Sequence, residues 1–236
     1  MVDKEFVRLL SIVLLSLLTA CAGPPRHARR EPPVRTLLFA DRVWEVRPST
    51  RSAAPGPNAW SDAAEAAWVD EDGLHLRLDR ADGAWRSVEL STTLPPEAVH
   101  VAATLATPVG QLDPAAVVGL FVYKDDQHEA DIEFSRWGHA DQALNAQFAV
   151  APYEPDQRHR FRVEPEATRS HHVLDWRGDR VAFQSRVNGA VVAEWRHTAA
   201  HWTDRTGYRL HLNLWMYEGR APDGPSEVVF SDLVVE

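Results

Sequence analysis

Short runs of alternating apolar and polar residues follow one another from about residue 37, and no stretch has the apolar spacing of a long helix. In 74–79 (LHLRLD), for example, every second residue is leucine. Such alternation is typical of strands with one buried face. We predict strands at 74–79, 85–90, 98–106, 117–123, 129–136, 144–150, 159–164, 172–176, 180–187, 190–196, 208–217 and 227–235.

Turn residues separate these runs. Asp-Gly pairs stand at 72–73 and 82–83, and Asn188-Gly189 is the strongest hairpin signal in the chain. Many short strands divided by such turns predict an all-β sandwich of two antiparallel sheets. No domain boundary is visible within 37–236, so we expect one domain there.

Three of the predicted strands carry polar and aromatic residues on one face and apolar residues on the other. On 208–217 the first face holds His211, Asn213, Trp215 and Tyr217. Glu89 likewise shares a face with Trp85 and Ser87, and Gln147 shares one with Asn145. A sheet face of this kind suits a concave sugar-binding cleft, where tryptophan stacks on sugar rings and polar groups fix their orientation.

The N-terminal run at 6–20 (FVRLLSIVLLSLLTA) is too short to span a bilayer as a mature helix and has the length of a signal-peptide core. It ends at Cys21, the single cysteine, and Leu18-Thr19-Ala20-Cys21 resembles the lipobox of bacterial lipoproteins. This resemblance implies that 1–20 are removed and that Cys21 carries lipid. The alternative is a chance cysteine behind an ordinary secretory signal.

The segment 21–36, rich in proline and arginine, is then predicted to be the lipidated cysteine and its tether. Lipid chains, and not a spanning helix, would supply the membrane affinity. Because Ala22 and not Asp follows the cysteine, the resemblance implies sorting to the outer membrane in a Gram-negative cell.

Composition narrows the class of partner. The formal net charge of −9 argues against nucleic acid, which needs a basic patch. One cysteine excludes an internal disulfide framework. The histidines lack zinc-site spacing, so we predict no metal and no cofactor. We expect a monomer whose nine tryptophans offer flat surfaces to a ligand.

Three carboxylates alternate within 128–138 (HEADIEFSRWG). In a strand, Glu129, Asp131 and Glu133 share one face, and a purely structural strand gains nothing from their repulsion. Glycoside hydrolysis requires two carboxyl groups, one protonated and one ionised. The Cα atoms of i and i+4 lie roughly 13 Å apart, so both glutamates must lean inward to reach the ~5 Å carboxyl separation of retaining enzymes. The alternative is a solvated acidic face on an edge strand.

The segment from Glu129 to Phe134 resembles the E-[hydrophobic]-D-[hydrophobic]-E-F signature of glycoside hydrolase family 16. Further segments resemble the family in the same order, at 57–60, 85–90, 175–189 and 212–215, so the resemblance covers about 40–236. It implies a concanavalin A-like jelly roll. It also implies retaining endo-hydrolysis of a β-linked polysaccharide of the β-glucan or galactan type. Some members hold a structural calcium, for which no dedicated loop is evident.

The resemblance implies a role for each carboxylate. Glu129 would be the nucleophile, Asp131 would tune the pair, and Glu133 would be the general acid and then the general base. We expect burial and the neighbouring carboxylates to raise the pKa of Glu133 while Glu129 stays ionised.

Residues that match sugar-binding positions are Asn58, Glu89, Gln147 and Asn213. The tryptophan that lichenase-like members place before the motif is missing, so Tyr123 or Trp137 would supply stacking, and Trp215 lies on the same predicted face. The family's Gly-Tyr-Gly-x-Tyr strand is not evident either. A non-catalytic carbohydrate-binding surface lipoprotein on the same fold is therefore the main alternative. A purely structural envelope lipoprotein would leave the cleft face unexplained.

Overall fold

The computed structural model describes residues 33–97, 100–198, 202 and 204–236. Val34–Glu236 forms one compact unit. The predicted signal peptide and Cys21 lie outside the described residues. No helix in the described ranges is long and apolar enough to cross a membrane.

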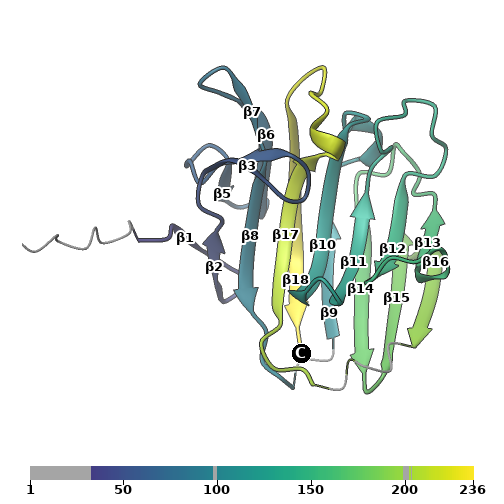
Figure 1. Cartoon of the computed structure of the whole chain (residues 1–236). Helices are drawn as coiled ribbons and strands as arrows, with labels where there is room; N and C mark the ends of the chain where they lie inside the picture. Colours follow the sequence, from purple (N-terminus) through teal and green to yellow (C-terminus); the bar gives the residue numbers. More distant parts are fainter. Residues whose placement is uncertain (1–32, 98–99, 199–201, 203) are drawn as a thin grey trace, which may run out of the picture. The chain divides into compact units, whose positions relative to one another are not determined.

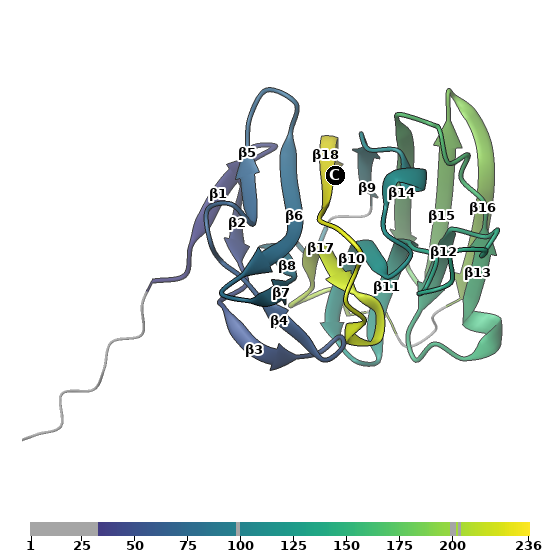
Figure 2. The same cartoon turned by 90° about the horizontal axis from the view of Figure 1, so that it is seen from above.

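Two large antiparallel sheets form a sandwich (Figures 1 and 2). The first sheet has the order β1 (Thr36–Phe39), β2 (Arg42–Val46), β8 (Val88–Thr93), β17 (Arg209–Met216), β10 (Ala116–Asp125), β11 (His128–Phe134), β12 (Ala146–Val150) and β13 (Arg158–Phe161). The second has the order β16 (Ala190–Thr198), β15 (Arg180–Val187), β14 (Ser170–Arg177), β9 (His100–Leu105), β18 (Ser226–Val235), β6 (Leu74–Ala81) and β5 (Ala67–Val69). The prediction of an all-β sandwich is confirmed.

Shorter elements complete the fold. β7 (Ala84–Arg86) pairs with β6, and β3 (Thr50–Ala53) pairs with β4 (Asn58–Trp60). Three single turns of 3₁₀ helix lie at Val109–Gln111, Pro155–Gln157 and Tyr217–Gly219.

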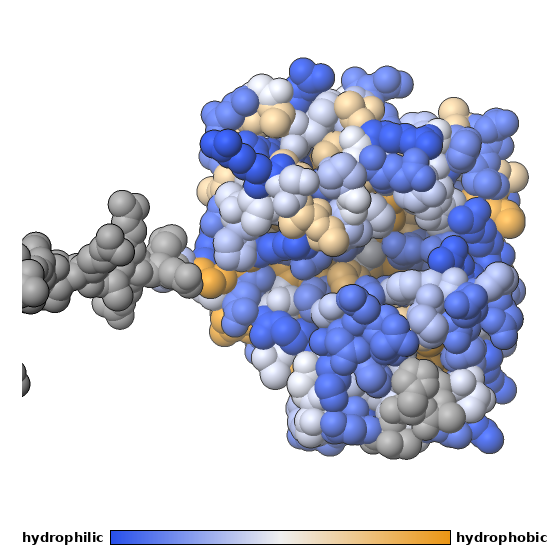
Figure 3. Space-filling view, in the orientation of Figure 1, coloured by the Kyte–Doolittle hydropathy of each residue, from blue (hydrophilic) through white to orange (hydrophobic). Residues whose placement is uncertain are grey.

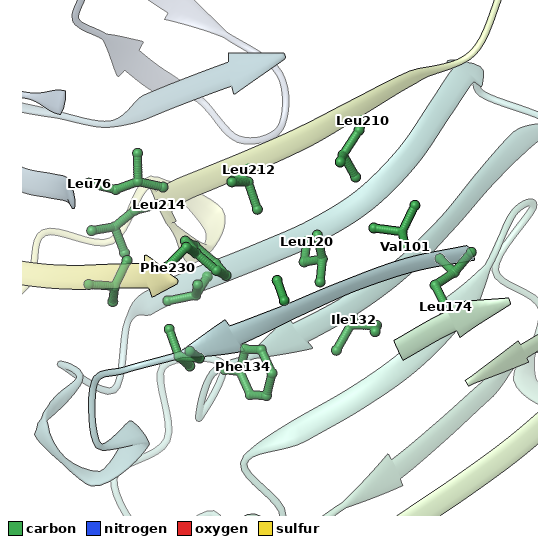
Figure 4. Packing of buried hydrophobic residues seen from close by; sticks show 14 of the residues in the cluster. Leu76, Val101, Leu120, Ile132, Phe134, Leu174, Leu210, Leu212, Leu214 and Phe230 are labelled. Carbon is green, nitrogen blue, oxygen red and sulfur yellow. The ribbon is translucent and has the colours of Figure 1, made fainter. Parts of the chain in front are cut away.

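The core lies between the sheets (Figure 4). Leu120, Ile132 and Leu212 enter it from the first sheet and are at most 1% exposed. Leu174 and Phe230 meet them from the second. A slip of one residue in β11 would move its apolar side chains to the solvent face and its carboxylates into this core. Burial of the core therefore fixes which face the carboxylates occupy.

The predicted hairpin turns are confirmed. Asn188 and Gly189 both have positive φ, 51° and 79°, and join β15 to β16. Asp82 and Gly83 do the same between β6 and β7, with φ of 51° and 76°. Asn, Asp and Gly tolerate this conformation, which matches the twist of the paired strands.

The predicted strand 85–90 is wrong as a single element. It breaks at Ser87, so that β7 joins the second sheet and β8 the first. Trp85 consequently lies apart from Glu89, although simple alternation places them on one face. The five strands before residue 70 were not predicted, because their short segments alternate weakly.

Candidate active site

The carboxylate strand β11 lies inside the first sheet, between β10 and β12. Glu129, Asp131 and Glu133 line a cleft of about 660 Å³ on the outer face of that sheet. Figure 3 shows this face hollowed, with mostly hydrophilic residues around the hollow. Beneath the cleft, Ile132 and Phe134 are fully buried. An exposed acidic edge strand is thereby excluded, since β11 is internal and Asp131 is only 5% exposed.

Strand register arranges the cleft in transverse rows. The row through Glu133 runs Glu89, Asn213, Gly119, Glu133, Gln147, Arg160, from β8 to β13. The row through Asp131 runs Ser91, His211, Phe121, Asp131, Ala149, Arg158. Because neighbouring strands lie about 4.8 Å apart, each row places its side chains side by side across the floor.

Gly119 leaves a gap in the first row. A Cβ atom there would lie 2.5 Å from Asn213 Oδ1 and 3.3 Å from the ring of Phe121. The Asn213 side chain therefore occupies the space that a side chain at position 119 would fill. Asn213 Oδ1 is buried there without a hydrogen-bond partner, so it accepts a bond from a ligand hydroxyl only when the side chain turns toward the cleft.

Glu133 is joined to an arginine through an amide. Gln147 Nε2 donates to Glu133 Oε2 at 2.5 Å, and Arg160 Nε donates to Gln147 Oε1 at 3.3 Å. Burial raises the pKa of Glu133, while Gln147 and the charges of Arg158 and Arg160 pull it down. The pKa remains above its ordinary value, as expected for a general acid.

The other two carboxyls also hold protons more tightly than usual. Burial raises the pKa of Glu129 to about 7, although bonds with Tyr153 and Asp131 oppose the rise. Burial and the charges of Glu129 and Glu133 raise the pKa of Asp131 well above its ordinary value. Asp131 Oδ2 is buried without a hydrogen-bond partner. The expected rise in the pKa of Glu133 is found, but the pKa of Glu129, which we expected to stay ionised, is raised as well, because all three groups share one desolvated floor.

On the opposite wall of the cleft, formed at β8, Glu89 is held in its ionised form. Arg47 lies 3.6 Å from Glu89 and His211 lies 3.5 Å from it. Burial alone would raise the pKa of Glu89, but the His211 contact and the charges of His211 and Arg47 bring it below its ordinary value. The Arg47 guanidinium also stacks 4.1 Å from the centre of the Trp60 ring.

The cleft brings together all but one of the residues predicted for binding. Those lining it are Glu89, Tyr123, Trp137, Gln147, Asn213 and Trp215. Tyr123 donates its hydroxyl to Asp126 at 3.0 Å, and Trp137 lies beneath Arg160, 4.2 Å from its guanidinium carbon.

Asn58 is the exception and corrects the prediction of a sugar contact there. It is fully buried and lies outside the cleft lining. Its Nδ2 donates to the Pro55 and Met216 carbonyls at 2.7 and 3.0 Å. Its Oδ1 accepts from Ser87 at 2.8 Å and from the Met216 amide at 3.0 Å. With its polar atoms engaged, Asn58 joins β4 to the ends of β17 and β8 and does not face a ligand.

Sequence reasoning missed several lining residues, notably Arg47, Tyr153, Arg158 and Arg160. Tyr153 follows the cis Ala151-Pro152 bond with φ of 70°, and no local pattern indicates that it reaches the floor. The two β13 arginines could have been found, because they alternate with His159 and with buried Phe161.

Within the described part of the chain, one group outside the cleft has metal-ligand chemistry: Asp70, Asp72 and His75, whose ligand atoms lie within 4.8 Å of one another. Both ring nitrogens of His75 are already engaged, by Asp70 at 2.9 Å and Glu227 at 3.0 Å. Internal hydrogen bonds explain this group without an ion.

No protein-family model and no curated protein matches the sequence. Solved structures do match the fold. The Bacillus licheniformis β-glucanase superposes with a TM-score of 0.60 at 14% identity, over 87% of this chain and 98% of that one. A β-1,3-glucanase from Mycobacterium marinum gives 0.60 at 13%, over 88% and 100%.

A third match is a GH16 protein from Bacteroides ovatus in complex with a G4G4G3G product. Its TM-score is 0.60 at 13% identity, over 84% of this chain and 97% of that one. Identities this low carry the fold and not the activity. The chain is thus a jelly-roll sandwich of the kind that these glucanases share.

Proposed function

We propose that this protein is a retaining endo-glycoside hydrolase acting on a β-linked polysaccharide of the β-glucan or galactan type. The observation that carries the proposal is that Glu129, Asp131 and Glu133 lie along one face of an internal strand, with their carboxyl groups desolvated at the floor of an open cleft. The shared fold of β-glucanases supports it.

In the first step, Glu133 donates its proton to the glycosidic oxygen while the Glu129 carboxylate attacks the anomeric carbon. The C–O bond to the leaving sugar breaks, and a glycosyl ester to Glu129 forms. In the second step, Glu133 takes a proton from water, whose oxygen attacks the same carbon and releases Glu129. Atoms and charge balance over the two steps, with net consumption of one water.

Asp131 supports this exchange from between the glutamates. With a raised pKa it keeps its own proton, and its bond with Glu129 favours the ionised form of that nucleophile. The Tyr153 hydroxyl acts in the same direction. Asn213 and Glu89 line the cleft in the Glu133 row, where their side chains are placed to bind sugar hydroxyls.

We place the enzyme at the bacterial cell envelope as a lipid-anchored monomer, in the outer membrane if the cell is Gram-negative. The lipobox-like segment ending at Cys21 motivates this location. A Cys21→Ser variant should then fail to incorporate radiolabelled fatty acid and leave the membrane fraction. Equal labelling of wild type and variant would contradict it.

The second candidate is a carbohydrate-binding protein without turnover. One observation favours it: burial raises the pKa of Glu129 to about 7, so part of the population holds the nucleophile protonated and unreactive at neutral pH while the cleft can still bind. Binding without hydrolysis would decide for this candidate.

The test incubates the full chain with lichenan, laminarin, xyloglucan, agarose and carrageenan and measures new reducing ends. Glu129→Gln should lower turnover at least about a thousandfold, because it removes the nucleophile. Glu194→Gln, an exposed change on β16 in the other sheet, should leave turnover unchanged. Retention of one polymer in affinity electrophoresis, with no reducing ends from any of them, would replace the hydrolase with the binding protein.

A further inference from the structure

The edge strand β13 presents two arginines to the cleft. Arg158 and Arg160 are two residues apart and both line it, while Phe161 is turned into the core. They stand in the Asp131 and Glu133 rows, with β12 between them and the carboxylates. Two strand spacings amount to roughly 10 Å from β11, so the pair would meet a sugar beyond the one attacked.

The charge of Arg158 is not neutralised by a direct contact with any described residue. Among the described residues, no acceptor lies within hydrogen-bond distance of its guanidinium and no carboxylate forms an ion pair with it. Its guanidinium carbon lies 5.7 Å from the centre of the Tyr153 ring. Arg47 across the cleft differs, because Glu89 neutralises it.

Arg160 is held in place and still has hydrogen-bond donors that are not used. Its Nε is used by Gln147, and its guanidinium stacks on Trp137. The two terminal nitrogens have no partner within the described part of the chain. A guanidinium fixed by one bond and one ring loses little freedom when it binds a ligand.

We propose that Arg158 and Arg160 bind an anionic group carried by the polysaccharide, a sulfate ester or a uronate carboxylate. This substrate class rests on the proposed carbohydrate cleft. The arginine fork matches the paired oxygens of both groups bidentately. In a chain of net charge −9 whose cleft floor is acidic, an unpaired arginine beside an oriented one is the local feature that makes an acidic glycan favourable.

Anion binding would also act on the general acid. The charges of Arg158 and Arg160 pull down the pKa of Glu133. A bound anion neutralises them, so the pKa of Glu133 rises and the acid stays protonated to higher pH. An acidic substrate should therefore extend activity toward alkaline pH relative to a neutral one.

The test measures binding in the Glu129→Gln background of the full chain, so that turnover plays no part. The probes are laminarin and a neutral galactan, each unmodified, sulfated or carboxymethylated. We expect at least one charged form to bind about tenfold or more tighter than its neutral parent, with a preference that weakens in high salt. The sulfated and carboxymethylated arms separate the two anion types.

The decisive comparison uses matched arginines. The double variant Arg158→Ala/Arg160→Ala should lose the preference for charged polymer, and Arg158→Lys/Arg160→Lys should restore part of it. Arg162→Ala is the control, because Arg162 lies two residues further on, is 49% exposed, pairs with Glu164 and lies outside the cleft lining. Circular dichroism and the thermal midpoint establish that each variant is folded.

Equal binding of charged and neutral polymers would overturn the proposal. An equal loss in the Arg162 control would overturn it too, because the attraction would then belong to the surface in general. These outcomes are separate from the proposed hydrolysis. If a neutral polymer is cleaved and the β13 arginine variants cleave it equally well, the proposed hydrolase would be supported and the acidic substrate contradicted.

Discussion

The two walls of the cleft are built from the same parts and reach opposite electrostatic results. On one side Arg47 stacks on Trp60 at 4.1 Å and pairs directly with Glu89 at 3.6 Å. On the other side Arg160 stacks on Trp137 at 4.2 Å, but Gln147 stands between it and Glu133. The pKa of Glu89 is lowered and that of Glu133 is raised.

The difference shows what determines the protonation state of a buried carboxyl group. Burial raises both pKa values, and what opposes it decides the outcome. His211 and the directly paired Arg47 outweigh burial at Glu89. An amide donor in place of the direct ion pair does not outweigh it at Glu133. One wall therefore binds with a fixed charge, and the other can hold a transferable proton.

The largest expected effect on kinetics distinguishes Glu133, the proposed general acid, from Glu89, the proposed sugar-binding residue. Glu133→Gln should lower kcat by about 10²–10⁴, because it removes the transferable proton. Glu89→Gln should mainly raise KM, by about tenfold, because it weakens a hydrogen bond to the sugar. Both constants are measured on whichever polymer the wild type cleaves. Equal losses of kcat in the two variants would erase the distinction between the walls.

The next largest effect is on the pH dependence of the free energy of unfolding, which should differ between Glu129 and Glu89. The folded pKa of Glu129 is about 7 against an ordinary 4.5, so its ionisation penalises the folded state as pH rises between these values. Glu129→Gln should therefore stabilise the protein near pH 8 by roughly 1–3 kcal/mol and do nothing below pH 4.

Glu89→Gln should do the reverse. The lowered pKa of Glu89 stabilises the folded state at neutral pH, and this contribution is lost as pH falls through the folded value. The variant should be less stable near pH 8 by roughly 1 kcal/mol, a difference that shrinks in acid. Urea midpoints at the two pH values measure both changes, and shifts of the same sign at pH 8 would contradict the assignment.

The smallest effect concerns the amide itself. Gln147→Leu removes the donor to Glu133 and the acceptor for Arg160, so the pKa of Glu133 should rise further. We expect the alkaline limb of the pH–rate profile to move to higher pH, with kcat/KM lower by about tenfold. Gln184→Leu, on β15 of the second sheet, is the control. A profile that does not move would show that Gln147 holds no influence over the acid.

The all-β sandwich and the shared face of the three carboxylates follow from alternation, whereas the roles of these carboxylates come from the family resemblance. Glu129, Asp131 and Glu133 fall on one face because the apolar residues between them must be buried. Alternation also places Gln147 and Asn213 on the polar faces of their strands, although the resemblance selected them as sugar-binding positions. Alternation does not predict cleft residues that are placed by the path of a connecting segment. Tyr153, after β12, and Arg47, after β2, are such residues.

The error at Asn58 has a similar origin. A polar residue near the start of a strand is equally suited to bind a ligand or to join backbone segments. Only the positions of Ser87 and Met216, far away in the sequence, show that the second use applies. Likewise, Ser87 marks a change of sheet that leaves the local pattern unaltered.

Gly119 has a consequence for how the protein can vary. Every amino acid other than glycine brings a β-carbon, and at this point any β-carbon would collide with the Asn213 amide oxygen. A substitution at position 119 therefore requires the Asn213 side chain to move, while the fold depends here only on the backbone of β10. A lineage that replaces this glycine would keep the sandwich but present a differently arranged cleft floor to any ligand.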